Sequence, residues 1–487
     1  DNVAGDDAFD GAAPAPAEAG RGPFRTIGRA LRAAGAGDTV HLNPTGQVYR
    51  DAADFYGHPG GEAGSPIVLD GHGATLSGAD PCAPPDWKPR KDGVWVCPKP
   101  SSGFLVVEGR MVFELLARDA LKEGEFCYEF ERLYFLVPSG KKVEQFRIAV
   151  GQGEQAVPLE PARWQRSHSK VGALQYPGLS RPAWVELDGR RVELVDPRDR
   201  LGAGQWSGRD GAIAFRPPDG QAPADLAIER VVRANAVQLS GRTAHVVVRN
   251  LHARHFHNDG FNIHGAVADA VFLNVTASHL GDEGFSSHDD CQTILDGAVF
   301  RFCCNGIFNV NRARTVTRNV ILADNREVGF GCHEQAQDVL ENVILIDNPS
   351  QLSVVGAKVD NALIVRTAGA DVRSQAMHCQ GSTVLRRVTA AGNADLLRSD
   401  AGAETTMQDC LLAPGQGAVH VRADDPAGVL RLRNVRFGAG TKVEWGSRWP
   451  WKALPVEAWV EEVRGKGVAE GVAVVETDFH EALVTGR

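Results

Sequence analysis

Short runs of β-branched and other apolar residues recur through the second half of the chain, each centred on one polar or glycine position. These central positions are Asn250, Asn274, Gly297, Asn319, Asn342, Asn361, Arg387, Asp409 and Asn434. The steps between them are similar along the whole series, as in a repeat of constant length. Such a repeat, with strand-type residues, polar corners and almost no amphipathic helix, is typical of a parallel β-solenoid, in which each coil buries its apolar face against the next. The L-x-x-L-x-L pattern of leucine-rich repeats is missing.

The pattern therefore predicts an all-β protein, a right-handed parallel β-helix running from about residue 38 to about 440. Near the start, GPFRTIGRALRAAGAGDTVHL predicts a short amphipathic helix from the N-cap Thr26 to Ala34, followed by a strand over 39–42. This helix would cap the open end of the solenoid. We expect four segments: 1–79, the N-terminal cap and first coils; 80–230, an insertion; 231–440, the main β-helix carrying the active site; and 441–487, a C-terminal cap.

The insertion contains a duplication in which every matching pair of positions has the same offset. The segment Val107 to Arg110 matches Leu187 to Arg190, Phe126 matches Trp206, and Phe135 matches Phe215. Alternating runs closed by Pro and Gly turns predict a small antiparallel β module in each copy. Such modules could wall one side of a groove or only buttress the solenoid.

Composition and charge exclude several classes of protein. Fifty-two Lys and Arg against 61 Asp and Glu give a net charge of -9, and no basic run is interleaved with aromatics, so nucleic acid is not an expected partner. No apolar run approaches the roughly 18 to 20 residues of a membrane span. A processed secreted protein would begin like this chain, as would a cytosolic one; we expect a secreted or periplasmic bacterial protein whose signal peptide is not in this sequence. Among the nine cysteines, Cys82 and Cys97 could form a disulfide.

The candidate chemistry lies on four successive coils aligned on Gly260, Gly284, Gly306 and Gly329. Just before these glycines, Asp259, Glu283 and Asn305 should form one column, because stacked strands lie about 4.8 Å apart. Asp282 lies beside this column. Carboxylates on neighbouring coils repel each other unless a cation, a shared proton or a substrate resolves the conflict, so the column predicts an active site rather than a structural ladder. Four residues after the glycines, a second column holds His264, His288, Val310 and His333.

The order of these motifs resembles that of the polygalacturonase-type β-helix glycoside hydrolases, whose NTDG, DDC and GHG motifs follow on successive coils. Here the motifs are NDGF at 258–261, GDEGFSSH and CCNGIFNVN. The resemblance implies that Asp259 and Glu283 are water-activating or nucleophilic carboxylates and that Asp282 is the general acid. Glu283 replaces the family's Asp, Asn305 replaces its His, and no RIK motif follows, so galacturonate recognition is not implied.

The duplicated insertion also looks like the small β module of the β-helix β-xylosidases and related fucosidase-type enzymes, which place an Asp and a Glu on adjacent coils. That resemblance pairs Asp259 with Glu283 as nucleophile or base and acid/base. The expected function is a glycoside hydrolase acting on a poly- or oligosaccharide through Asp259, Asp282 and Glu283. The expected substrate-binding residues are Asn258, Asn262, His264, His288, Asp289, Asn305, Asn309, His333 and Glu334.

Two alternatives remain open. EGFSSHDD at 283–290 also resembles the DPHD segment of mannuronan-type epimerases, which implies a lyase or C5-epimerase of a uronate polymer with His288 as base. No cofactor is required for hydrolysis, whereas this reaction could use Ca²⁺ held by Asp282, Glu283, Asp289 and Asp290, with Arg254, Arg312, Arg314 and Arg326 as nearby cations. A non-catalytic β-helix is the third class, but it would carry uniform ladders. The oligomeric state is not predicted.

Overall fold

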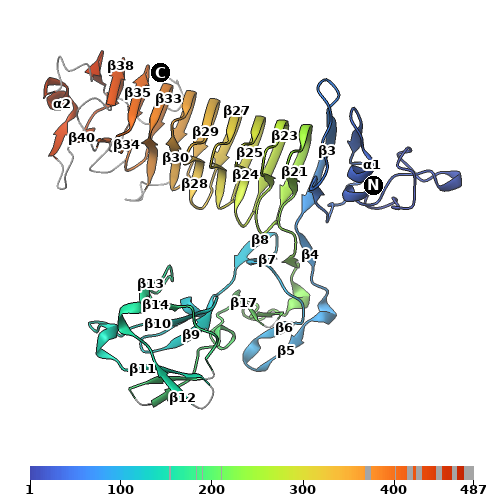
Figure 1. The fold of residues 1–487 in the computed structure, drawn as a ribbon, viewed down its shortest axis with the longest axis vertical. Helices are drawn as coiled ribbons and strands as arrows, with labels where there is room; N and C mark the ends of the chain where they lie inside the picture. Colours follow the sequence, from blue (N-terminus) through green and yellow to red (C-terminus); the bar gives the residue numbers. More distant parts are fainter. Residues whose placement is uncertain are drawn as a thin grey trace. The chain divides into compact units, whose positions relative to one another are not determined.

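The computed structural model describes residues 1–152, 155–182, 184–188, 190–209, 211–367, 374–400, 402–413, 421–423, 430–445, 452–462 and 469–475. Its contacts divide the chain into two compact units, Asp1–Ala79 with Arg233–Arg487, and Asp80–Val232. The first unit is the predicted parallel β-helix, whose coils follow one another as successive rungs (Figure 1). Among the described residues, no helix is long and apolar enough to cross a membrane.

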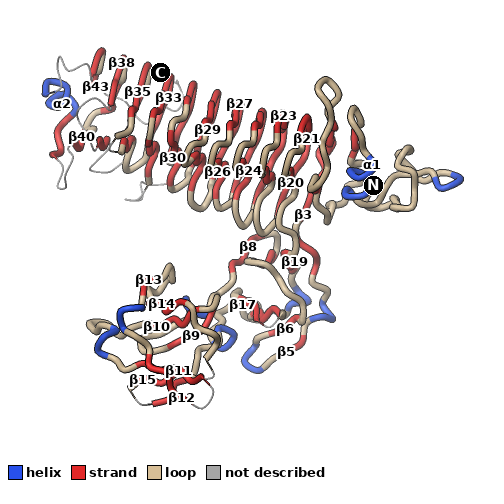
Figure 2. The backbone as a smooth tube through the Cα atoms, in the orientation of Figure 1, coloured by secondary structure: helices blue, strands red, loops and turns tan. Residues whose placement is uncertain are grey.

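Two long sheets form the described part of the β-helix, and each coil contributes a strand to both of them (Figure 2). The fifteen-stranded sheet contains β1 Thr39–His41, β3 Ile67–Ser77, β21 Ala244–Arg254, β23 Ala268–Ser278, β25 Gln292–Arg301, β27 Arg314–Ala323, β29 Gln337–Ile346, β31 Lys358–Val365, β33 Ser382–Ala391, β35 Glu404–Gln408, β36 Leu411–Ala413, β38 Leu430–Arg433, β39 Arg436–Gly438, β42 Ala469–Glu470 and β43 Ala473–Val475. Its paired strands are parallel throughout the central coils.

The twelve-stranded sheet runs beside it and is built from shorter strands. They are β2 Ala53–Asp54, β20 Val237–Leu239, β22 Phe261–Ile263, β24 Glu283–Ser287, β26 Asn305–Asn309, β28 Val328–Cys332, β30 Ser350–Val355, β32 Gln375–Gln380, β34 Leu397–Ser399, β37 Val421–Ala423, β40 Lys442–Trp445 and β41 Lys452–Pro455. Apolar side chains from both sheets meet in one continuous core that includes Phe261, Phe272, Phe285 and Ile307.

The repeated polar positions of the sequence are left-handed corners inside the long strands. Asn250, Asn274 and their successors up to Asn434 all have φ between 49° and 73°. Asn tolerates this conformation better than β-branched residues do, and Gly297 takes the same place in one coil. The Nδ2 of Asn274 donates to the Oδ1 of Asn250 at 2.9 Å, so the corners also form a ladder between coils.

Both ends of the β-helix carry short helices. Helix α1, Ile27–Ala33, lies at the N-terminal end, and the Thr26 hydroxyl accepts a hydrogen bond from the backbone N–H of Arg29 at 3.2 Å, as the sequence predicts. Ile27 and Leu31 of this helix join the solenoid core. Helix α2, Val456–Glu462, buries Trp459 at the other end. Much of the predicted C-terminal cap, including 446–451, 463–468 and 476–487, lies outside the described residues.

The second unit is the predicted duplicated antiparallel module. It contains four four-stranded sheets. The first is β13 Gln165–Arg166, β14 Leu174–Pro177, β10 Arg132–Phe135 and β9 Phe126–Glu129, and the second is β12 Gln155–Pro158, β11 Ile148–Gln152, β15 Val185–Leu187 and β16 Arg190–Val192. The third is β17 Trp206–Arg209, β18 Ala212–Phe215, β6 Trp95–Cys97 and β5 Lys88–Pro89, and the fourth is β4 Ala79–Pro81, β19 Ile228–Val231, β7 Phe104–Val107 and β8 Arg110–Phe113. The short 3-10 helices η4 Ala117–Asp119 and η5 Val143–Gln145 recur at the matching positions of the second copy as η7 Pro197–Asp199 and η8 Pro223–Asp225.

The two copies exchange strands. Strand β11 of the first copy pairs with β15 of the second, and β19 of the second pairs with β7 of the first. The copies therefore form one unit rather than two independent ones. The possible disulfide between Cys82 and Cys97 is not formed: both are free thiols, and their side chains are joined by a hydrogen bond.

Candidate active site

Three carboxylates meet at one edge of the twelve-stranded sheet. Strand pairing aligns Phe261 with Phe285, and Glu283 with Asn305, so Asp259 precedes β22 at the level where Glu283 begins β24. Oxygen atoms of Asp259, Asp282 and Glu283 all lie within 4.8 Å of one another. One repeat in the sequence is therefore one coil in space, as the sequence predicts.

Asp259 lies beneath the other two carboxylates. It is 1% exposed. Its Oδ1 accepts the backbone N–H of Glu283 at 3.1 Å, and its Oδ2 accepts a hydrogen bond from the Nδ2 of Asn262. Its own backbone N–H donates to the Oδ1 of Asn235 at 3.1 Å. Asp282 and Glu283 are only half-buried, so they are the members of the cluster that a substrate can contact.

The cluster retains a proton. Burial is the main cause that raises the pKa of Glu283, and the neighbouring charge of Asp259 raises it further. Burial likewise raises the pKa of Asp259, and a hydrogen bond joins the two side chains. The Nδ2 of Asn305 donates to the Oε1 of Glu283 at 2.9 Å. These causes favour a proton bound to the pair, and Glu283 is its partly exposed member.

The histidines form a second group at the opposite edge of the same sheet. The rings of His264 and His288 stack with centroids 4.0 Å apart, and the Nε2 of His288 contacts the Oγ of Ser286. Burial, then the neighbouring His264, lowers the pKa of His288 to about 4, so its imidazole is neutral at pH 7. His333 packs against Phe308 with centroids 4.9 Å apart, and its Nε2 lies 3.2 Å from the Oγ of Ser353.

The carboxylates and the histidines lie at opposite ends of strand β24, and the charge of Asp282 still contributes to the pKa of His288. Glu283 begins strand β24 and His288 follows its last residue, a separation of about 16 Å at about 3.3 Å per residue. Between them, Ser286 and Phe308 alternate with the core residues Phe285 and Ile307 and so lie on the outer face of the sheet. The carboxylates and the histidines therefore border this part of the sheet from its two ends.

The remaining predicted residues connect neighbouring coils. Asn309 is 0% exposed; its Oδ1 accepts the N–H of Ser287 at 3.1 Å, and its Nδ2 donates to Asp338 at 3.1 Å. Asn309 therefore supports the strand from inside and does not reach the outer face. Asp289 accepts the N–H of Gly265 at 2.8 Å. Likewise, the Nδ2 of Asn258 donates to Asn235 at 2.9 Å and that of Asn311 to Glu334 at 2.8 Å.

Three further residues contact or adjoin the predicted site residues although sequence reasoning did not select them. Asn235 lies one coil below Asp259, and extending the repeat back by one coil would have found it. Phe308 stands two residues after Gly306, the position that Asn262 and Ser286 occupy in their coils. Asp338 lies one coil after its strand partner Thr315 and two coils after Thr293, so an acid in a column of threonines is the signal that the repeat offered.

Two groups of side chains among the described residues could hold a cation. The carboxylate cluster offers oxygen ligands, the kind that Ca²⁺ prefers, but Ca²⁺ takes six to eight of them and both oxygens of Asp259 already accept hydrogen bonds. At the first coil, His41, Asp70 and His72 come together, with the Nδ1 of His41 and the Nε2 of His72 2.8 Å apart. Arg249 and Asn250 already bind the Asp70 carboxylate there, which weakens it as a metal ligand.

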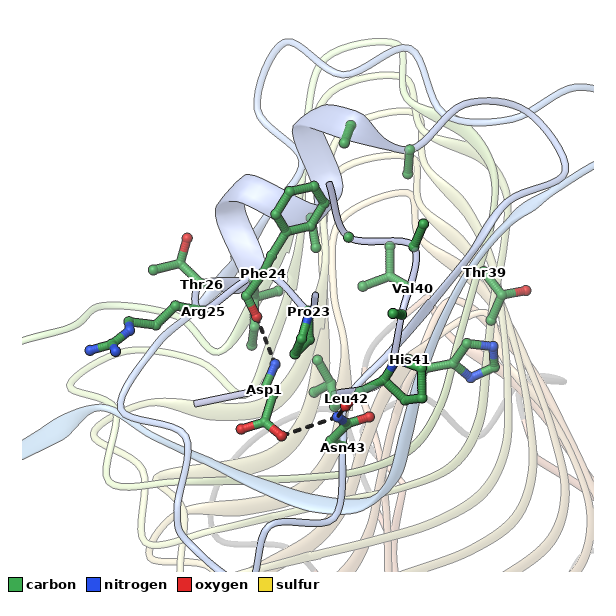
Figure 3. A pocket seen from close by; sticks show the side chains of 18 of the residues that line it. Asp1, Pro23, Phe24, Arg25, Thr26, Thr39, Val40, His41, Leu42 and Asn43 are labelled. Atoms are coloured by element: carbon green, nitrogen blue, oxygen red, sulfur yellow. Dashed lines mark hydrogen bonds between the residues drawn. The ribbon is translucent and has the colours of Figure 1, made fainter. Parts of the chain in front are cut away.

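A cavity of about 520 Å³ lies at the N-terminal end of the β-helix, away from the carboxylates (Figure 3). Phe24 and Ile27 line it together with Val40, and the Asp1 carboxylate accepts a hydrogen bond from the Nδ2 of Asn43 at 3.1 Å. Its lining includes none of the three clustered carboxylates, so we do not assign it a part in their chemistry.

Comparison with known proteins supports the fold. No protein-family model matches the chain, and no curated protein sequence matches it. Among solved structures, the complex of XylC with xylose is similar, with a TM-score of 0.50 and 11% sequence identity, covering 98% of this chain and 84% of that chain. At this identity the likeness shows a shared fold and no more.

Proposed function

We propose that this protein is a glycoside hydrolase acting on a poly- or oligosaccharide at the Asp259, Asp282 and Glu283 cluster. The observation that carries the proposal is a partly exposed Glu283 next to a partly exposed Asp282, above a buried Asp259, with burial and the Asp259 charge raising the pKa of Glu283. Glycosidic cleavage needs one protonated carboxyl group and one carboxylate on the two sides of the scissile bond. XylC, which shares the fold, was solved with xylose, and this supports a carbohydrate as the class of substrate.

The geometry favours Glu283 as the acid/base, as the β-xylosidase resemblance implies, but Asp282 rather than Asp259 as its partner, which differs from both resemblances. Glu283 carries the proton, so it donates to the glycosidic oxygen as the C1–O bond breaks. Asp282 then acts on the anomeric carbon. Asp282 and Glu283 are adjacent in the chain, and their nearest oxygens lie within 4.8 Å of each other, so both carboxyl groups can act at one glycosidic bond as they do in retaining enzymes. We therefore propose retention: Asp282 forms the glycosyl ester, and Glu283 then deprotonates the water that cleaves it.

Asp259 acts through Glu283 and not on the substrate. Its buried negative charge raises the pKa of Glu283, and its Oδ1 fixes the backbone at the start of β24. In this role it is a positioning residue. Asn262 and Asn305 complete the arrangement by donating to Asp259 and Glu283.

The second candidate is a uronate lyase or epimerase with His288 as base, and the neutral imidazole of His288 favours it. This reaction also needs cations that neutralise the substrate carboxylate. Arg312 pairs with Asp290 at 2.6 Å, and Arg326 donates to the carbonyl oxygens of Leu280 and Gly281. Two of the four expected arginines therefore already have partners, which makes hydrolysis the better-supported reaction.

The test is a digest of neutral and uronic polysaccharides and aryl glycosides, with and without EDTA, followed by product mass and by absorbance near 235 nm. We expect products with one added water, insensitivity to EDTA, and loss of activity in Glu283→Gln and Asp282→Asn. Glu327→Gln is the matched control, because Glu327 is an exposed acid on the same side of a later coil. Unsaturated products that depend on His288 would contradict the proposal.

A further inference from the structure

The inserted unit contains a pocket of about 250 Å³ between its two copies. Residues of the first copy line one side and residues of the second copy line the other: Ala117, Tyr128, Glu129 and Phe130, against Leu194, Val195, Pro197 and Gly208. Ala117 and Pro197 occupy equivalent positions of the two copies, as do Tyr128 and Gly208. The pocket therefore lies where the two copies face each other, and strand exchange between them holds its walls together.

The equivalent positions have diverged in a way that opens this pocket. Tyr128 supplies an aromatic ring whose hydroxyl donates to the carbonyl oxygen of Leu179 at 2.6 Å. Its counterpart Gly208 has no side chain, and its N–H donates to the Oε1 of Glu114 at 2.6 Å. A Cβ at Gly208 would lie 3.2 Å from that same oxygen, which is a tight contact. Tyr128 of the first copy thus forms one wall of the pocket, and Gly208 of the second copy leaves the space opposite it open.

The hairpin tip beside the pocket has residues that folding alone does not favour. Phe130 and Glu131 form the two-residue turn between β9 and β10, with φ of 49° and 56°. Such turns favour Asn-Gly or Asp-Gly, and a bulky residue with positive φ is costly. At the equivalent turn the sequence of the second copy has Asp210 and Gly211. Phe130 is 65% exposed and lines the pocket, so its ring is available to a ligand.

The charges around the pocket restrict the kind of ligand. The protein itself holds the Glu129 carboxylate: its Oε1 accepts the N–H of Ala117 at 3.0 Å, and its buried Oε2 forms an ion pair with the Nη1 of Arg118 at 3.7 Å. Burial raises the pKa of Glu129 and of Glu114, which favours their neutral forms. Arg118 and Arg181 offset these two acids, so the surroundings of the pocket carry no excess of either charge that would select an ionic ligand. The Arg118 guanidinium lies 5.4 Å from the centre of the Phe130 ring. It therefore occupies the position over the ring that a cationic ligand would need.

We propose that this pocket is a second, non-catalytic binding site and that it takes a neutral sugar ring. The apolar face of the sugar packs on Phe130 beside the ring of Tyr128, and Arg181, which also lines the pocket, donates to a hydroxyl. The site holds carbohydrate independently of the carboxylates on the β-helix.

Hydrogen exchange of the full chain tests this inference, with xylose, xylotriose, glucose, cellotriose and galacturonic acid as probes. We expect at least one neutral sugar to protect peptides covering 117–130 and 194–208. Phe130→Asp places the residue of the second copy in the turn, which favours the turn conformation while removing the ring. It should weaken binding at least about tenfold by calorimetry, about 1.4 kcal/mol, without lowering the melting temperature. Phe113→Ala, which removes another exposed ring of the unit outside the pocket, should not weaken binding.

The outcomes separate this site from the catalytic one. Protection that survives in Glu283→Gln but is lost in Phe130→Asp supports the second site, whatever reaction the carboxylates catalyse. Protection only in peptides around 283–287, or no protection by any probe, would show that the pocket is a gap left by the duplication. Preference for galacturonic acid over the neutral sugars would overturn the proposed class of ligand.

Discussion

The backbone N–H of Glu283 donates to the Oδ1 of Asp259 at 3.1 Å, although the two residues belong to different coils. The same ladder geometry occurs one coil below, where Asn235 accepts the N–H of Asp259, and further along, where Asn305 accepts the N–H of Val328. Two acids thus occupy places in a ladder that its other members fill with Asn. The repulsion between these acids is resolved by a shared proton, and that proton is what the proposed acid catalyst requires.

Glu283→Gln should lower kcat/KM on substrates with poor leaving groups by about 10² to 10⁴, because the proton donor is lost. The loss should shrink for aryl glycosides whose leaving group needs no protonation. The measurement is kcat/KM across a series of phenols of decreasing pKa. An equal loss for every leaving group would show that Glu283 does not act as the acid.

Asp259→Asn should move the alkaline limb of the pH profile to lower pH. Activity requires protonated Glu283 and is lost as pH rises through its folded-state pKa, which burial and the Asp259 charge hold above the usual range. Removing that charge lowers this pKa, so activity is lost at lower pH. The check is kcat/KM between pH 4 and 10, with circular dichroism to confirm folding. An alkaline limb that stays in place would exclude electrostatic positioning by Asp259.

Asp338→Asn should stabilise the protein increasingly as pH rises from 4 to 8. Burial raises the pKa of Asp338 to about 7, from an ordinary value of 3.8. A carboxyl group with a raised folded-state pKa contributes its stability fully below the unfolded value and loses it as pH rises through the folded value. The neutral amide avoids this loss, which is at most about 4 kcal/mol for a difference of roughly three pKa units.

The measurement for Asp338→Asn is the melting temperature of both proteins at several pH values. The amide oxygen of the variant can still accept from Asn309 and from the N–H of Thr315. The side-chain hydrogen bonds with Cys332 and Thr315 change, which adds an offset that does not depend on pH. A difference between the two proteins that does not change with pH would contradict the raised pKa.

Asn274→Val should destabilise the β-helix by about 1 to 2 kcal/mol or more, whereas Asn274→Gly should cost less. The residue has φ of 52°, a left-handed conformation that is strained for a β-branched side chain and permitted for glycine. Both variants lose the hydrogen bond to Asn250, so their difference isolates the backbone effect. Urea unfolding midpoints check this order, and equal midpoints would contradict it.

Much of the candidate site could be predicted because the solenoid converts sequence spacing directly into distance. Residues one repeat apart in the sequence lie one coil apart in space, which places Asp259, Glu283 and Asn305 in one column and stacks His264 on His288. Depth is different. Nothing in the sequence distinguishes Asp259, which is buried, from Asp282, which is half-buried, because the neighbouring coils and Asn262 decide which side chain is covered.

The sequence by itself determined the β-helix, the capping helix at Thr26, the duplication of the insertion and the alignment of the coils, because each follows from a local repeat. Only the tertiary structure decided that Asp259 and Glu283 share a proton, that Asn309 binds the buried Asp338, and that Tyr128 faces Gly208 across a pocket. These relationships depend on burial and on which side chains meet across coils or copies. Both are properties of packing in three dimensions, and no single segment of the chain encodes them.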